Sequence, residues 1–290
     1  MKKVLIIGRN GQVTTYLQRH LKGDYKVIVA GREQLDLLQT ETIQERLDSL
    51  NPDLIINPAA YTAVDLAEEN TEQADIINHL AVAEIARYSE QMSVPLIHFS
   101  TDYVFSGDAL IPYVETDEVA PAGVYGMSKY AGEQAILNSG APALILRTSW
   151  VYSNQGKNFY KTMVGLAETR NELNVVADQT GSPTYAGCIA QTTGQLLDLI
   201  LAQGKIKQEQ VGVYHFTCRG KTSWCDFARA IFKCHAIDNM QVNAITTEEY
   251  PTPAKRPAYS VLDNAKLQEV FGLSLPHWEK ALDDCIKEVT

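Results

Sequence analysis

The sequence predicts an α/β protein with a Rossmann-like, doubly wound parallel sheet followed by a smaller α+β lobe. Short apolar runs alternate with amphipathic helical patterns through the first half of the chain. The first apolar run ends in a glycine turn that opens a helical pattern. Beyond Trp150 the alternation becomes irregular, and Pro251, Pro253 and Pro257 crowd one stretch near the end. These observations favour a nucleotide-binding sheet with a second lobe.

Each apolar run of the first half is predicted to be a strand, with a helix between successive strands. Val13, Leu17 and Leu21 repeat at helical spacing after the first run. A long amphipathic pattern predicts one helix over residues 71–92, which ends before Pro95. The predicted strands are 3–7, 26–30, 54–57, 96–100 and 143–148, and a further helix is expected near 40–50. Parallel strands of this kind bind ligands at their carboxyl edge.

The second half is predicted to mix helices with few strands. Its expected elements are helices near 159–169, 186–202, 223–235, 264–270 and 278–287, and a strand at 212–217. We expect residues 1–150 to form the dinucleotide-binding domain and residues 151–290 to form mainly the substrate-binding lobe. Segments at about 174–217 and 240–260 are expected to return to the sheet.

The composition excludes several classes of protein. A formal net charge of −10 opposes binding to nucleic acid or to anionic lipid. No apolar run reaches the roughly 18 residues that a membrane span needs, and the N-terminus lacks a secretion signal. The five cysteines lack CxxC spacing and lie in apolar segments, which indicates reduced thiols and not disulfides or metal ligands. We therefore expect a cytoplasmic protein.

The glycine turn is a candidate cofactor site. In Gly8-Arg9-Asn10-Gly11-Gln12-Val13, the glycines let the backbone approach a pyrophosphate, to which the helix N-terminus offers N–H donors. Thr14 stands where the usual fingerprint has a third glycine, and its branched side chain is expected to push helix and strand apart. Taken alone, the turn is also compatible with an ordinary connection between a strand and a helix.

Other loops at the same edge predict which dinucleotide is bound. The second strand ends in Ala30-Gly31-Arg32, without the acidic residue that binds a ribose 2′-OH. Arg9 and Arg32 are placed to pair with a 2′-phosphate, so NADPH is favoured and NADH is the alternative, although both arginines also suit a solvated surface. Asp36 is expected near the adenine, and Asn57-Pro58-Ala59-Ala60 supplies small residues for close contact.

Tyr125 and Lys129 are a candidate proton-transfer pair. They lie four residues apart at the start of a helical pattern, so their side chains share one face. An adjacent ammonium stabilises a phenolate and is expected to lower the pKa of Tyr125 from its usual value near about 10. Thr101, at the end of a strand, is placed to donate to an oxygen that gains charge. By itself the spacing also fits a half-buried tyrosine beside a solvated lysine.

Several blocks along the chain together resemble a known family. They are Ser100-Thr101-Asp102-Tyr103-Val104-Phe105, Tyr125-Gly126-Met127-Ser128-Lys129-Tyr130-Ala131-Gly132-Glu133, Ala59-Ala60-Tyr61-Thr62-Ala63-Val64-Asp65, Arg147-Thr148-Ser149-Trp150-Val151-Tyr152, Asp178-Gln179-Thr180-Gly181-Ser182-Pro183-Thr184 and Arg256-Pro257-Ala258-Tyr259-Ser260. With the glycine turn, they resemble the extended short-chain dehydrogenases/reductases, and within that superfamily the dTDP-4-dehydrorhamnose reductase family.

The resemblance implies an NADPH-dependent reductase acting on the 4-keto group of dTDP-4-dehydro-L-rhamnose, for polysaccharide biosynthesis. It implies that Tyr125 donates the proton, that Lys129 holds the nicotinamide ribose and tunes Tyr125, and that Thr101 bonds the reacting oxygen. Asp102 and Trp150 are implied to contact the sugar. Residues implied to line the cofactor cleft are Gly8, Gly11, Gln12, Val13, Arg32, Asp36, Leu37, Ala59, Ala60, Tyr61 and Thr62. A monomer or a homodimer is expected.

This sequence departs from the family pattern at three places. Besides Thr14, Pro58 occupies a position usually held by a small residue, and Tyr16 stands where some members carry a glutamate that binds magnesium. We therefore expect no metal site. Arg256 is a candidate ligand for the substrate diphosphate, and a solvated loop residue is the alternative.

The remaining aromatic and imidazole side chains are expected to be structural. Trp224 and Trp278 are expected to be packing anchors on helices, and His98 a core residue of its strand.

The sequence leaves two other functions open. The first is a sugar-nucleotide dehydratase or epimerase of the same superfamily. Dehydratases typically carry an Asp-Glu pair after the threonine, but here the residues are Asp102-Tyr103, which favours simple reduction. Reduction of another 4-keto sugar nucleotide is a variant of the same activity. The second alternative is a non-catalytic NADPH-binding regulatory subunit, which would need no proton donor such as Tyr125.

Overall fold

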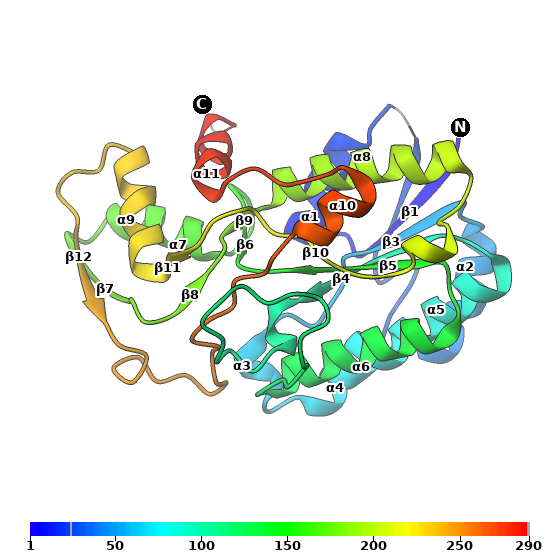
Figure 1. Ribbon diagram of the computed structural model, residues 1–290, viewed down its shortest axis with the longest axis horizontal. Helices are drawn as coiled ribbons and strands as arrows, with labels where there is room; N and C mark the ends of the chain where they lie inside the picture. Colours follow the sequence, from blue (N-terminus) through cyan, green and yellow to red (C-terminus); the bar gives the residue numbers. More distant parts are fainter. Residues whose placement is uncertain (24, 289–290) are drawn as a thin grey trace.

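The computed structural model describes residues 1–23 and 25–288, and its centre is a six-stranded parallel sheet (Figure 1). The strands are β1 (Lys3–Ile7), β2 (Lys26–Ala30), β3 (Leu54–Asn57), β4 (Leu96–Thr101), β5 (Ala143–Thr148) and β10 (Gly212–His215). Their order is β10-β5-β4-β3-β1-β2, and every neighbouring pair is parallel. The chain runs outward from β1 in both directions, which confirms the doubly wound sheet.

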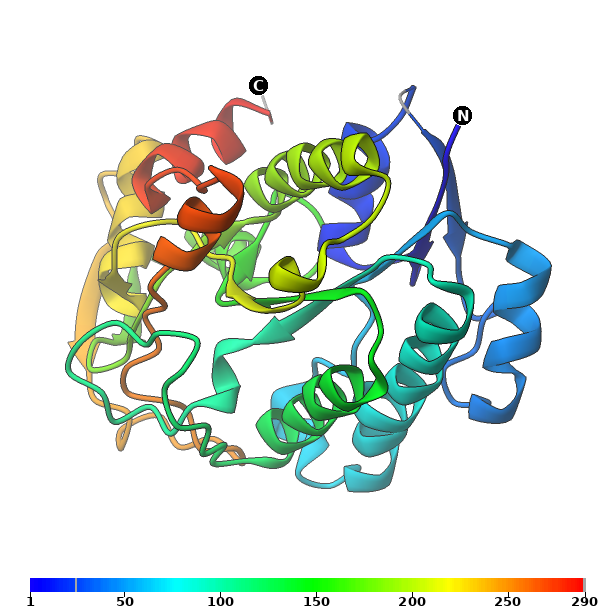
Figure 2. The same cartoon turned by 45° about the vertical axis from the view of Figure 1, so that its right-hand side comes forward.

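Helices cover both faces of this sheet. In β1, Val4 and Ile6 face one core together with Leu17, whereas Leu5 and Ile7 face the other, because successive side chains of a strand alternate. Helices α1 (Gln12–His20) and α8 (Ala186–Gln203) lie on the first face. Helices α2 (Ile43–Leu50), α5 (Ala81–Met92) and α6 (Val124–Ser139) lie on the other, as the turned view also shows (Figure 2).

The helix predicted over 71–92 forms, but it contains a π turn. Helix α4 (Thr71–Asp75) continues through Ile76–Leu80, a π-helical segment, into α5. Such single turns widen a helix by one residue. The segment packs so closely on α6 that a Cβ at Gly132 would lie 2.1 Å from the backbone oxygen of Asn78.

The smaller lobe lies at one end of the sheet (Figure 1). Its main elements are α7 (Phe159–Ala167), β7 (Glu172–Val176), α9 (Trp224–Cys234), β12 (Gln241–Ile245) and α11 (Trp278–Lys287). Strand β10 joins the large sheet beside β5. The expectation that segment 240–260 returns to that sheet is wrong for β12, which instead pairs with β7 over five residues. Helix α9 packs on both strands and buries their inner face.

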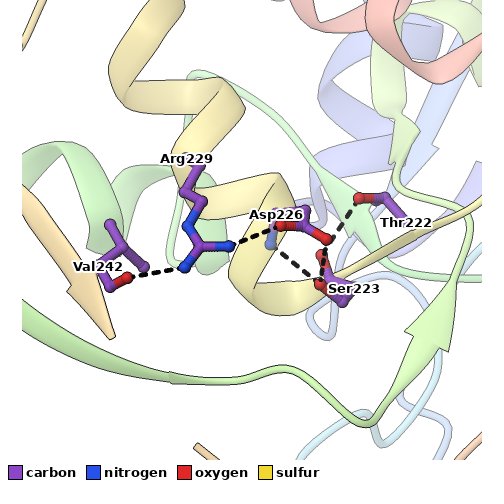
Figure 3. A network of polar contacts seen from close by, with 5 residues as sticks. All are labelled: Thr222, Ser223, Asp226, Arg229 and Val242. Atoms are coloured by element: carbon purple, nitrogen blue, oxygen red, sulfur yellow. Dashed lines mark hydrogen bonds and ion pairs between the residues drawn. The ribbon is translucent and has the colours of Figure 1, made fainter. Parts of the chain in front are cut away.

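Helix α9 begins with a network of polar contacts (Figure 3). The hydroxyl of Ser223 accepts from the N–H of Asp226 at 3.0 Å, which caps the first turn. Arg229 donates to Asp226 at 2.9 Å and to the backbone oxygen of Val242 at 2.9 Å, so the helix is tied to β12. These contacts fix Trp224, the first residue of α9, at the border between the lobe and the sheet.

Short elements complete the described chain. They are η1 (Thr40–Thr42), α3 (Val64–Ala67), η3 (Asp102–Val104), β6 (Val151–Tyr152), β8 (Thr180–Gly181), β9 (Thr184–Tyr185), η4 (Gln208–Gln210), β11 (Thr222–Ser223) and α10 (Ala265–Phe271). Over residues 1–23 and 25–288, no helix is both long and apolar enough to cross a membrane.

Candidate active site

A cleft of about 950 Å³ opens at the carboxyl ends of β1, β2, β4 and β5, where the strand order reverses. Most of the site residues predicted from the sequence line it. These are Gly8, Gly11, Gln12, Val13, Arg32, Asp36, Leu37, Ala59, Ala60, Thr62, Thr101, Asp102, Tyr125, Lys129 and Trp150. Tyr61 and Arg256 are absent from the lining.

Gly8 gives the glycine turn its close approach. Its φ of +89° lies in the left-handed region, and a Cβ there would lie 3.1 Å from Cβ of Ala59. Thr14 is buried, and its hydroxyl lies beside Gly11 without breaking the turn. The turn thus keeps a narrow cradle before the N-terminus of α1, which suits a pyrophosphate.

Gln12 connects the cofactor helix to the second lobe. Its side-chain oxygen accepts from the hydroxyl of Ser153 and from the amide of Asn158, each at 2.7 Å. Asn158 also caps α7, because its side chain accepts from the N–H of Lys161 at 3.0 Å. Lys157 and Asn158 line the cleft. The sequence did not single out this loop, since its contacts join residues more than 140 positions apart.

The end of β2 carries the positive charge expected for a 2′-phosphate. The Arg9 side chain passes over Gly31, where an added Cβ would lie 3.3 Å from Arg9 Nε. Arg9 also donates to the side chain of Gln34 at 3.3 Å. Arg32 is exposed and lines the cleft beside Glu33. Two guanidinium groups at this edge fit an anionic ribose substituent better than a free 2′-OH.

Tyr61 is placed behind the cleft and not in it. Its backbone N–H donates to Asn78 Oδ1 at 2.8 Å, and its carbonyl accepts from Asn78 Nδ2 at 3.2 Å. Asn78 also donates to Ser128 on α6 at 3.0 Å. The π turn therefore presents an amide that holds the loop carrying Ala59, Ala60 and Thr62.

Thr101, Asp102 and Tyr125 meet at the end of β4. The Thr101 hydroxyl donates to Asp102 Oδ1 at 3.0 Å and accepts from the N–H of Tyr103 at 3.2 Å. The ring of Tyr125 packs edge-on against that of Tyr103 with centroids 5.5 Å apart. Burial raises the pKa of Tyr125, while the nearby Thr101 hydroxyl partly lowers it. Tyr125 is thus protonated at neutral pH and can act as an acid.

The lysine does not play the part that its spacing suggested. Lys129 Nζ donates to the backbone oxygen of Phe99 at 2.7 Å and lies 3.2 Å from His98 Nε2. The pKa of Tyr125 is not lowered as expected, because burial raises it. Burial also lowers the pKa of Lys129 itself to about 8.

Asp102 is a buried carboxylate, and one of its two oxygens has no hydrogen-bond donor among the described residues. It is 2% exposed, and burial raises its pKa to about 6, opposed by the hydroxyls of Ser260 and Thr101. Among the described residues, its Oδ2 has no hydrogen-bond partner of normal geometry. An unpaired acceptor at this depth is costly unless a ligand hydroxyl reaches it. Asp102 is therefore suited to hold a polyhydroxylated substrate.

An aromatic wall closes the other side of the cleft. The indole rings of Trp150 and Trp224 stack with centroids 3.5 Å apart, and Phe159 lies 4.6 Å from Trp224. Trp150 has a φ of +47° and lies flat on Gly181, where a Cβ would come within 2.4 Å of the ring. The expectation that Trp224 only anchors its helix is wrong, because the ring also lines the cleft.

Arg256 is already paired. It lies 2.6 Å from Asp65 Oδ2 and 3.2 Å from the hydroxyl of Tyr103, and Asp65 also accepts from the N–H of Ala254. The expected contact with a diphosphate does not match this arrangement, because the guanidinium is neutralised outside the cleft lining. The pair instead ties the loop of residues 252–260 to α3.

Tyr16 belongs to a buried polar network. Its hydroxyl lies 2.6 Å from Asn154 Oδ1 and 2.9 Å from Glu288 Oε2, and it accepts from Tyr185 at 3.2 Å. Within residues 1–23 and 25–288, no group of three or more His, Cys, Asp or Glu side chains could hold a metal ion.

The switch-point cleft, with Thr101, Tyr125 and Lys129 in its lining, is that of an oxidoreductase of the extended short-chain dehydrogenase/reductase class. The model of the family described as "RmlD substrate binding domain" matches residues 1–290. The chain belongs to this family, and the curated relatives that it matches include several named dTDP-4-dehydrorhamnose reductase.

Relatives match along nearly the whole chain. The dTDP-4-dehydrorhamnose reductase of Burkholderia thailandensis is 40% identical over 99% of both chains. That of Escherichia coli K12 is 39% identical over 99% of this chain and 97% of its own. The solved structure of the Bacillus anthracis reductase in complex with NADP has a TM-score of 0.91 and 36% identity over 99% of both chains.

Proposed function

We propose that the protein reduces the 4-keto group of dTDP-4-dehydro-L-rhamnose with NADPH to give dTDP-L-rhamnose, a precursor of cell-surface polysaccharide. The observation that carries the proposal is that Thr101, Tyr125 and Lys129 line one cleft together with the glycine turn. The near full-length identity to reductases of this name supports the substrate. The NADP complex of the Bacillus anthracis reductase supports the cofactor.

The cradle at Gly8 fits the pyrophosphate of a dinucleotide, and Arg9 and Arg32 fit its 2′-phosphate. Gly11, Gln12 and Val13 begin the helix that faces it, and Asp36, Leu37, Ala59, Ala60 and Thr62 line the remainder. Bound NADPH supplies the hydride. In this proposal residues 1–150 mainly hold the cofactor and residues 151–290 mainly hold the substrate.

The chain's own residues handle the proton. As the substrate carbonyl oxygen gains charge, the Thr101 hydroxyl turns from Asp102 to donate a hydrogen bond to it, and Tyr125 gives it a proton. Lys129 holds the ribose and returns a proton to Tyr125. Asp102 accepts from a sugar hydroxyl, and Trp150 contacts the sugar from the aromatic wall. Arg256 shapes the loop beside them and does not contact the diphosphate, given its pairing with Asp65.

We further propose a cytoplasmic enzyme that works as a monomer or a homodimer. All five cysteines are free thiols, and four of them are buried, which suits a reducing compartment.

The test is turnover by the purified protein. Loss of nicotinamide absorbance should require dTDP-4-dehydro-L-rhamnose, and mass spectrometry should find a product heavier by two hydrogen atoms. Parallel assays with UDP- and GDP-linked 4-keto sugars and with NADH measure specificity. Turnover of another nucleotide alone would reassign the substrate. Binding of NADPH without turnover of any 4-keto sugar would favour the non-catalytic alternative.

A further inference from the structure

A buried chain of side chains reaches Lys129 from beneath the cleft. Nδ2 of Asn57, at the end of β3, lies 3.1 Å from Nδ1 of His98 on β4. Nε2 of His98 lies 3.2 Å from Nζ of Lys129 on α6. Asn57 and His98 have no exposed surface, and Lys129 is 1% exposed. These side chains thus link three elements, and Lys129 is the one of the three that lines the cleft.

The orientation of the Asn57 amide determines the tautomer of His98. Asn57 Oδ1 accepts from the backbone N–H of Ala59 at 3.2 Å, so the NH₂ group faces the imidazole. A side-chain amide offers only donors on that side, and therefore His98 Nδ1 must accept. A neutral imidazole carries one proton, which is then on Nε2. Burial and the neighbouring Lys129 lower the pKa of His98 well below its usual value, so the ring is neutral.

We propose that Asn57 holds His98 as the tautomer protonated on Nε2, and that this N–H, aimed at Lys129 Nζ, makes His98 a positioning residue for the proton-transfer lysine. Nζ can donate to the Phe99 carbonyl at 2.7 Å and accept from His98 only when it is an amine with a lone pair. The arrangement therefore favours the neutral amine and opposes the ammonium.

The other groups around Lys129 leave this effect in place. Glu133 on α6 raises the pKa of Lys129, but its carboxylate is held by two hydrogen bonds from Arg147 on β5, at 2.9 and 2.6 Å. Burial is the larger influence and lowers the pKa of Lys129 to about 8. Lys129 thus gains and loses a proton close to neutral pH.

The consequence for catalysis rests on the proposed function. When Tyr125 gives its proton to the substrate oxygen, it is left as a phenolate. Only the ammonium form of Lys129 has a proton to give, and with a pKa of about 8 that form is populated at neutral pH. When Lys129 passes this proton to the phenolate, it becomes the amine that the His98 N–H and the Phe99 carbonyl stabilise, and it then regains a proton from solvent in the cleft. A lysine held permanently as an ammonium would release its proton far less readily.

The first test measures the tautomer and needs neither cofactor nor substrate. In ¹⁵N-labelled protein, the two ring nitrogens of His98 are assigned by their loss in His98→Gln. We expect Nδ1 to give the signal of an unprotonated nitrogen and Nε2 that of a protonated one, both unchanged across neutral pH. A proton on Nδ1 would overturn the inference, whether or not the protein proves to reduce a 4-keto sugar.

The second test reverses the tautomer. In Asn57→Asp a carboxylate replaces the amide donor, draws the proton to His98 Nδ1 and leaves Nε2 to accept from an ammonium. The alkaline limb of kcat for reduction should then move up by about one pH unit. The control is His215→Gln, a buried histidine of β10 whose Nδ1 lies 3.0 Å from the Asp263 carbonyl oxygen and which does not contact Lys129. If the alkaline limb of the kcat pH profile does not move in Asn57→Asp, or moves by the same amount in His215→Gln, the proposal is contradicted.

Discussion

Trp150 and Trp224 stack with their ring planes 5° from parallel, although one lies in a loop after β5 and the other in the first turn of α9. Trp150 keeps a φ of +47°, which a non-glycine residue adopts at a cost. The stack and the bare surface of Gly181 hold its ring in place from two sides. The aromatic wall is therefore formed by one residue next to the large sheet, Trp150, and one residue of the smaller lobe, Trp224.

Trp224→Ala should raise KM for the sugar nucleotide about fivefold with a smaller change in kcat, because an aromatic pair contributes roughly 1 kcal/mol and Trp150 would lose its support. Steady-state kinetics checks this. The KM of Trp224→Phe should lie between the values of Trp224→Ala and the wild type. Trp278→Phe, a control in the core outside the cleft lining, should leave KM unchanged. An unchanged KM in Trp224→Ala would contradict a binding role.

Tyr125→Phe should lower kcat by a factor of about 10² to 10⁴, since it removes the acid but keeps the ring that packs against Tyr103. The Kd of NADPH, measured by fluorescence titration, should stay within about twofold. Tyr103→Phe is the matched control: it loses the bond to Arg256 and should retain most of the turnover. Equal rates for Tyr125→Phe and the wild type would exclude Tyr125 as the proton donor.

Asp102→Asn should stabilise the protein at alkaline pH. The pKa of Asp102 is about 6 in the folded state against an ordinary 3.8, so the folded protein holds this proton more tightly than the unfolded chain does. The stabilisation from the bound proton is complete below about pH 3.8 and is lost as pH rises through about 6. At about pH 8, urea unfolding should show the variant more stable by up to about 3 kcal/mol, a difference that disappears near about pH 4.

Asp53→Asn is the control of opposite sign for that experiment. The N–H of Lys3 lowers the pKa of Asp53, so this variant should lose stability at about pH 8. A destabilised Asp102→Asn at both pH values would show that its carboxylate is satisfied in the folded state.

Arg256→Ala and Asp65→Asn should have similar effects on KM, because both break the pair that ties residues 252–260 to α3. The double variant should be little worse than either single one, as expected for two residues in one interaction. Steady-state kinetics of the wild type, the two single variants and the double variant completes this double-mutant cycle. A much larger loss in Arg256→Ala than in Asp65→Asn would instead indicate direct contact with the diphosphate.

Gly8→Ala should weaken NADPH binding at least about tenfold, because the new methyl group needs a strained φ and meets Ala59. Gly23→Ala carries a similar strain, with a φ of +104°, but its Cβ would meet nothing within 4 Å. Calorimetric titration should therefore find normal affinity in Gly23→Ala. Equal affinities in the two variants would show that the close approach at Gly8 is not needed for binding.

The sheet and its edge could be predicted because their signals are local. Strands β1 and β3 hold short continuous apolar runs whose residues are buried, and the glycine turn marks the start of α1. The two-residue strands carry no periodicity, so β6, β8, β9 and β11 could not be predicted. The partner of β12 depends on which face of α9 covers it, which is a tertiary property.

The site was predicted least well where partners come from distant segments. Arg256 and Asp65 are 191 residues apart, and no local pattern indicates their pairing. The strand pattern placed His98 in the core, and its burial is confirmed, but burial says nothing of a bond to Lys129. The spacing of Tyr125 and Lys129 indicated a shared helix face, yet the lysine is directed by the Phe99 carbonyl.

The π turn at Ile76–Leu80 has a consequence for how this region tolerates changes of length. The π turn accommodates one extra residue, so deletion of a single residue here would leave an ordinary α-helix and keep α5 in register. Ile85 and the other apolar side chains of α5 would stay on the sheet, but the turn that presents Asn78 to Tyr61 and Ser128 would be lost. The segment can accept substitutions at exposed positions such as Leu80, whereas its extra residue is required for the contacts of Asn78.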